Sequence, residues 1–215
     1  GIVSLLSCEV VGNNAPYYSG GGAYIVSGTT YMHDTLFVDN SANYGGAVLF
    51  SGSTLDMEDC QILNNTADAY GGGMKISGGS SEITGCAFHG NKAVQSATAS
   101  GGGALQIISG TTRLTDCTIS SNTAALHGGG IYVQSEWPTV TLTSSKFESN
   151  AATDGVDVFL YQKPKLYVFS SCAANTFNSG QGTLQCESNT GSGNTACSAE
   201  YPADLSVGEC SSCAD

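Results

Sequence analysis

The chain has 215 residues, 29 of them glycine, and carries a formal net charge of −12 although only 11% of its residues are charged. Nucleic acids and anionic membranes attract basic surfaces, so this acidity excludes both as expected partners. We expect no membrane span, because no apolar run reaches the roughly 18 residues that a transmembrane helix needs. Nine cysteines in a lysine-poor chain favour an oxidising compartment, and hence an extracellular or cell-surface location.

From the amino end onward, one pattern recurs six times. An asparagine followed two positions later by alanine returns every 25 to 31 residues. Apolar residues stand three and eight positions before each asparagine, and a small residue stands five positions before it. A glycine cluster follows each of the first five units. The repeated asparagines are Asn13, Asn40, Asn65, Asn91, Asn122 and Asn150.

Within each unit, apolar and polar residues alternate with a period near two, as in residues 112–115, which indicates short β-strands. Glycine, asparagine and Ser-Gly turns divide a unit into three such strands. Three strands and three corners make one coil of a parallel β-helix, in which coils stack about 4.8 Å apart. The sequence therefore predicts an all-β fold, a right-handed single-stranded parallel β-helix of about six to seven coils over residues 1–171.

Two of the repeated positions have a clear physical role in such a coil. An asparagine at the same corner of every coil can bond its side-chain amide to the asparagines above and below, which satisfies corner backbone groups. The small position is filled by Cys8, Thr35, Cys60, Cys86, Cys117 and Ser145. This position is interpreted either as a stack of small inward side chains or as the place of a disulfide, Cys60 with Cys86 or Cys86 with Cys117.

Two short motifs recur inside the coils. Phe-x-x-Asn occupies residues 37–40, 88–91 and 147–150, and Gly-Gly-Ala followed by Val or Leu occupies residues 45–48 and 102–105. In these motifs, the first 160 residues or so resemble the repeats of the polymorphic outer-membrane proteins, a β-helical autotransporter adhesin family. The resemblance implies a passenger-like stalk or an adhesive surface.

Two outward features are candidates for modification or binding. Asn64-Asn65-Thr66 is an N-glycosylation sequon, and Asn64 points outward if Asn65 belongs to the ladder. Trp137, the only tryptophan, lies where an insertion breaks the Ser-Gly turn of the fifth coil. Long loops on a solenoid often carry binding, so Trp137 is either a sugar or partner contact or a buried packing residue.

The sequence does not indicate a group of residues that could act together as nucleophile, base and orienting residue. Asp34, Asp59 and Asp116 share one position of the coil, but Gly85 separates the last two, which favours a solvated face. The three histidines occupy different positions. Asp154 and Asp157 flank Gly155 and give a weak possibility of calcium; no other cofactor or metal is expected.

The last part of the chain departs from the repeat. Residues 172–215 hold five cysteines and few apolar residues, so this stretch is predicted to be a disulfide-stapled cap or the start of a further module. The disulfide candidates there are Cys172, Cys186, Cys197, Cys210 and Cys213.

These observations favour an extracellular structural or adhesive surface module over an enzyme. The expected partners are copies of the chain, other surface proteins and glycans, and a fibre could form by end-to-end or lateral packing. The alternatives are a polysaccharide-processing lyase or hydrolase of the β-helix class, and a monomeric adhesin passenger.

Overall fold

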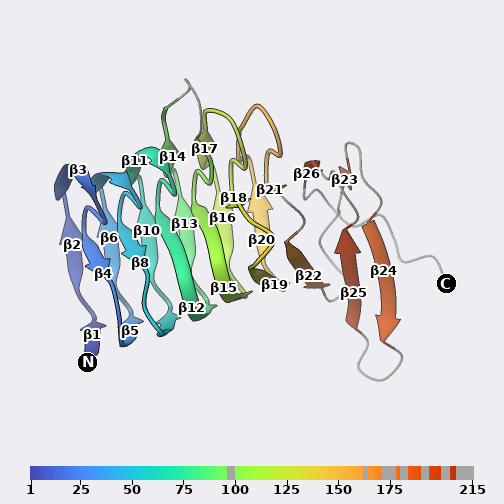
Figure 1. The fold of residues 1–215 in the computed structure, drawn as a ribbon, viewed down its shortest axis with the longest axis horizontal. Helices are drawn as coiled ribbons and strands as arrows, with labels where there is room; N and C mark the ends of the chain where they lie inside the picture. Colours follow the sequence, from blue (N-terminus) through green and yellow to red (C-terminus); the bar gives the residue numbers. More distant parts are fainter. Residues whose placement is uncertain are drawn as a thin grey trace.

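The protein is a stack of β-coils (Figure 1). The computed structural model describes residues 1–95, 100–161 and 164–170, and strands at 178–179, 184–189, 194–199 and 204–206. Every element in the described part of the chain is a strand, so no helix there is long and apolar enough to cross a membrane. The successive coils pair in parallel, which confirms the predicted parallel β-helix.

Three sheets form the walls of the stack. The strands of the first sheet are β1 (Ile2–Leu6), β4 (Ala23–Ile25), β5 (Thr29–His33), β8 (Val48–Phe50), β9 (Thr54–Glu58), β12 (Met74–Thr84), β15 (Leu105–Thr115), β18 (Ile131–Val133), β19 (Thr139–Thr143), β21 (Val158–Leu160), β22 (Lys165–Ser170), β23 (Asn178–Ser179), β24 (Leu184–Asn189), β25 (Asn194–Ala199) and β26 (Asp204–Ser206). Those of the second are β2 (Glu9–Val11), β6 (Leu36–Val38), β10 (Gln61–Leu63), β13 (Ala87–His89), β16 (Thr118–Ser120) and β20 (Lys146–Glu148). Those of the third are β3 (Asn14–Ser19), β7 (Ser41–Tyr44), β11 (Thr66–Tyr70), β14 (Lys92–Ala93) and β17 (Thr123–Ala124).

The predicted Ser-Gly turns have two outcomes. Ser27-Gly28 and Ser51-Gly52 do separate strands, β4 from β5 and β8 from β9. Ser77-Gly78 and Ser109-Gly110 lie inside strands, which corrects their predicted role. In β12 and β15 the strand runs through the pair, and the register between these strands shifts at Ser77. Such an irregularity bends a strand without ending it. The first sheet therefore has two halves that meet at this bend, and each coil crosses both.

Apolar side chains from all three walls fill the interior. Phe37, Ile62, Phe88 and Ile119 occupy the same inward position of the second sheet and are fully buried. The alanines that follow the four middle ladder asparagines are also buried, as the narrow corner requires; they are Ala42, Ala67, Ala93 and Ala124. Burial of this apolar surface is the main force that stabilises the fold, at about 25 cal/mol per Å².

The two ends of the stack differ. At the amino end, Ile2 and Leu6 of β1 are exposed. At the other end, parallel pairing stops at β22, which pairs antiparallel with β25, while β21 pairs antiparallel with β26. The edges of β21 and β22 therefore bond to the chain's own strands.

Candidate functional site

The six asparagines form a continuous ladder at the corner between the second and third sheets. In each step, the side-chain oxygen of one asparagine accepts hydrogen bonds from the backbone N–H and the side-chain amide of the asparagine one coil earlier, at 2.9–3.1 Å. From the second rung on, each amide also donates to a backbone carbonyl of the preceding coil, as Asn91 does to Ile62. The last rung, Asn150, also donates to the buried carboxylate of Asp157 at 2.9 Å.

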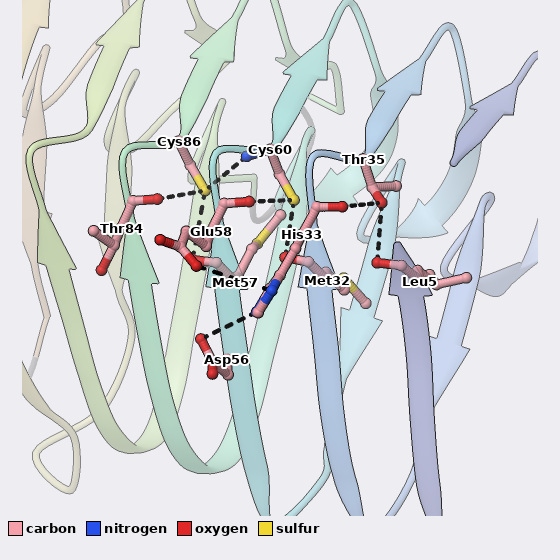
Figure 2. Close-up of polar contacts among 10 residues, drawn as sticks. All are labelled: Leu5, Met32, His33, Thr35, Asp56, Met57, Glu58, Cys60, Thr84 and Cys86. Carbon is pink, nitrogen blue, oxygen red and sulfur yellow. Dashed lines mark hydrogen bonds and ion pairs between the residues drawn. The ribbon is translucent and has the colours of Figure 1, made fainter. Parts of the chain in front are cut away.

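The small position forms a second ladder (Figure 2). The thiol of Cys60 donates to the carbonyl oxygens of Met32 and Glu58, and the hydroxyl of Thr35 bonds the matching carbonyls one coil earlier. Cys60 is also bonded to the following coil, because its backbone N–H donates to the sulfur of Cys86 at 3.3 Å. Cysteine, threonine and serine are interchangeable here because each offers one donor and one acceptor.

The disulfide alternative for these cysteines is wrong in this structure. Cys60, Cys86 and Cys117 are free, as is Cys8, and each thiol of the buried three points to backbone carbonyls of two coils. The hydrogen bond with Cys60, together with burial, raises the pKa of Cys86, and burial raises the pKa of Cys117 to about 11. The thiols of Cys86 and Cys117 therefore stay protonated at neutral pH and act as structural polar groups.

The backbone conformation explains why aspartate recurs at one position of the coil. Asp34, Asp59 and Asp116 all have φ near +50°, and Gly85 fills the same position with φ of 65°. Glycine, asparagine and aspartate tolerate this left-handed conformation best. The residue before each ladder asparagine has the same requirement, which Asn64 meets with φ of 54°. Asn64 is exposed, and its glycosylation stays a prediction.

One histidine lies between two carboxylates on the outer side of the first sheet (Figure 2). The Nε2 atom of His33 is 3.6 Å from Asp56, and its Nδ1 atom is 3.9 Å from Glu58. All three side chains are partly exposed, and such surface pairs contribute little stability. This cluster brings together residues of β5 and β9, which are paired strands of neighbouring coils. The sequence alone did not indicate that these three side chains lie together.

A column of aromatic rings lies beside the glycine clusters, where the third sheet meets the first. We call it the aromatic column; its members are Tyr44, Tyr70, Tyr132, His127 and Phe159. Tyr44 stacks on Tyr70 with ring centroids 6.1 Å apart, and Tyr70 stacks on Tyr132 at 6.0 Å. His127 stacks on Phe159 at 4.5 Å. None of the five belongs to the core cluster of the interior.

Glycines make the aromatic column possible. Gly101 occupies the place between Tyr70 and His127, and a Cβ atom there would lie 2.3 Å from the Tyr132 ring. The ring of Tyr132 therefore fills the space that a side chain at position 101 would take. Sequence reasoning missed this column. Its available signal was the aromatic residue directly before a glycine cluster, as in Tyr44 and Tyr70.

Two polar groups accompany the aromatic column. The Nζ atom of Lys75 lies 4.1 Å from the centre of the Tyr44 ring and 5.7 Å from that of Tyr70. At the other end, Nδ1 of His127 is 3.1 Å from a carboxylate oxygen of Asp154. Asp154 thus pairs with His127 while Asp157 accepts from the ladder. Within the described residues, no group of three or more His, Cys, Asp or Glu side chains could hold a metal ion.

The remaining predicted residues are placed as follows. Trp137 lies in the loop between β18 and β19 with 76% of its surface exposed, so the buried interpretation of this residue is wrong. Cys186 and Cys197 are directly opposite each other in the antiparallel pair β24–β25. Cys172, Cys210 and Cys213 lie outside the described residues.

The stacked parallel coils, with inward apolar rows and corner ladders, define a β-helix. The family model described as right handed beta helix region matches residues 1–127, and the chain belongs to this family. Comparison with curated proteins and with solved structures found no match. The fold is compatible with a surface module and with a polysaccharide-processing enzyme.

Proposed function

We propose that this chain is a structural or adhesive module of a secreted or cell-surface protein. One observation supports this most: the asparagine ladder continues without interruption from Asn13 to Asn150. Each coil is bonded to the next by the same buried contacts, which gives a stiff rod with long side faces. The Phe-x-x-Asn and Gly-Gly-Ala motifs, which resemble those of surface adhesins, support the same proposal.

The side faces are the surfaces that such a rod would present to partners. The edges of β21 and β22 bond to β26 and β25, so these edges are not available for stacking a second copy. At this end of the first sheet, lateral packing is therefore favoured over end-to-end packing for a fibre. Exposed Trp137 and the aromatic column are the first places to look for a contact.

Two experiments test this proposal. Antibody labelling of intact source cells, with permeabilised cells as control, asks whether the protein is on the surface; a signal only after permeabilisation contradicts it. Incubation with insoluble polysaccharides then separates binding from turnover. Retention without release of reducing ends supports a module, and release of reducing ends supports an enzyme.

The polysaccharide-processing alternative has one specific observation in its favour. His127 and Asp154 form a 3.1 Å pair beside the rings of Phe159 and Tyr132, and a histidine oriented by a carboxylate can act as a general base. If turnover is found, His127→Ala should abolish it. His33→Ala, which changes the other histidine–carboxylate cluster, is the matched control.

A further inference from the structure

Two cysteines lie directly opposite each other in an antiparallel strand pair. β24 and β25 pair from Leu184 opposite Ala199 to Asn189 opposite Asn194, and in this register Cys186 is opposite Cys197. Two residues directly opposite each other lie on the same face of such a pair. The strand pairing therefore brings the two cysteines together without any change of the backbone.

The spacing of such a pair fits a disulfide. Opposed residues of antiparallel strands have Cα atoms about 4.5 or 5.5 Å apart, depending on whether the two residues exchange hydrogen bonds. A disulfide takes Cα atoms roughly 4.4–6.8 Å apart, so both kinds of pair lie within its range. A bond between Cys186 and Cys197 would also fix the register, because a slip by one residue would put the two cysteines on different faces.

The cysteines of the coils differ from this pair. Cys60 and Cys86 occupy equal positions of neighbouring coils, but both are free, and the thiol of each is bonded to backbone carbonyl oxygens of two coils. Their place in the ladder already gives each sulfur its partners. The repeated unit ends at Asn150 and holds no ladder position for Cys186 or Cys197.

The pair β24–β25 has little apolar sequence to hold it together. Its strands read Leu-Gln-Cys-Glu-Ser-Asn and Asn-Thr-Ala-Cys-Ser-Ala. An isolated two-stranded pair is marginally stable at best in water. Yet β25 covers the edge of β22, where Cys197 is opposite Val168. A covalent bond within the pair would keep β25 in that place.

We propose that Cys186 and Cys197 form a disulfide that holds β25 on the edge of β22. The bond forms by exchange with a small-molecule disulfide such as oxidised glutathione: one cysteine thiolate attacks it to give a mixed disulfide, and the other thiolate displaces the remaining glutathione. Two cysteine thiols are oxidised to one disulfide, and their protons and electrons leave on two molecules of reduced glutathione. This inference rests on the proposed function, because the bond persists in the oxidising compartment of a secreted or cell-surface protein.

Peptide mapping of the native protein tests the pairing. Source cells are lysed in an excess of alkylating reagent, which blocks free thiols before any exchange, and the unreduced protein is cleaved after Phe177 and Glu187. These cuts put Cys172, Cys186 and Cys197 on three different peptides. Mass spectrometry should find the peptides of Cys186 and Cys197 joined, and reduction should separate them. Alkylation of either cysteine, or a bond from either to another cysteine, would overturn the inference.

Hydrogen exchange tests whether the bond holds β25. The double variant Cys186→Ser with Cys197→Ser should exchange its β25 amides about tenfold faster or more, since a disulfide removes chain entropy from the opened state. Amides of β12, in the middle of the stack, should keep their rates. Cys8→Ser, which removes a free thiol of the first coil, is the matched control and should leave β25 unchanged. Equal β25 rates in the wild type and the double variant would overturn the role given to the bond.

Oxidation of the purified chain separates this inference from the proposed function. The reduced chain is incubated with reduced and oxidised glutathione and mapped in the same way. If the bond is found neither there nor in the native protein, the pairing is wrong, and the proposed function stands when the protein is labelled on intact cells. If the bond forms with glutathione but is absent from the native protein, the inference is also overturned; the compartment is then a reducing one, and the proposed function fails with it.

Discussion

The backbone N–H of Cys60 donates a hydrogen bond to the sulfur of Cys86, one coil further along, at 3.3 Å. The thiol of Cys86 in turn bonds the carbonyl oxygen of Thr84, at 3.3 Å. A single small side chain thus satisfies a donor of one coil and an acceptor of its own. This dual role explains why the position alternates between cysteine, threonine and serine.

Replacement of Cys86 should depend on polarity more than on size. Cys86→Ser keeps a donor and an acceptor and should cost less than about 1 kcal/mol, whereas Cys86→Val leaves the N–H of Cys60 without a partner and should cost about 1–3 kcal/mol. Urea unfolding at pH 7 measures both values. Equal stability of the two variants would contradict the polar role of the ladder.

The asparagine ladder should be the most sensitive part of the fold. Asn91→Ala removes the acceptor of two hydrogen bonds from Asn65 and the donor of two others, so we expect a loss of about 3 kcal/mol or more in the free energy of unfolding. The control is Asn64→Gly, because glycine already fills the equivalent position 90. The control should stay within about 1 kcal/mol of the wild type. Similar losses in both variants would show that the ladder bonds add little.

Stability should fall in alkali because of the buried thiols. The pKa of Cys117 is about 11 in the folded protein, against 9.0 for an ordinary thiol. The folded state therefore holds its proton more tightly, and this stabilisation is complete below pH 9 and is lost as the pH rises toward 11, by an amount on the order of 2 kcal/mol. Urea midpoints at pH 8 and pH 10.5 measure the loss. Cys117→Ser, which does not titrate in this range, should make it smaller; an unchanged loss would assign it to other groups.

Close approach of the coils should make Gly72 irreplaceable. A Cβ atom there would lie 2.3 Å from the carbonyl oxygen of Gly103 and 2.5 Å from the backbone of Lys92. These contacts are with backbone, which cannot rotate away, so Gly72→Ala should cost about 3 kcal/mol or more. Gly12→Asn is the control, since nothing lies within 4 Å of its Cβ position and asparagine accepts its φ of 66°. Thermal unfolding ranks the two; a small effect at Gly72 would mean that the corner can widen.

The sequence was sufficient to predict the fold because ladder positions repeat with the coil. Asparagine spacing, inward apolar rows and glycine clusters are all local patterns, and they led to a parallel β-helix that the structure confirms. Ser77-Gly78 and Ser109-Gly110 were wrongly predicted to end strands, since a turn and a bulge use the same residues.

The surface clusters could not be predicted in the same way. His33 meets Asp56 and Glu58 from another coil at neighbouring positions, and Tyr132 reaches across Gly101 to Tyr70. Such contacts depend on the direction in which a side chain leans after folding. Alignment of equal positions in the repeat does not reveal them.

The corner ladders also bear on how such a rod could change over evolutionary time. Each asparagine receives the same bonds from the coil before it and makes the same bonds to the coil after it, as Asn65 and Asn91 do. An in-frame duplication or deletion of one whole unit would therefore join matching surfaces and leave the cross-section intact. The length of the rod is a quantity that recombination can adjust in single steps, while a partial unit would leave donors and acceptors mismatched.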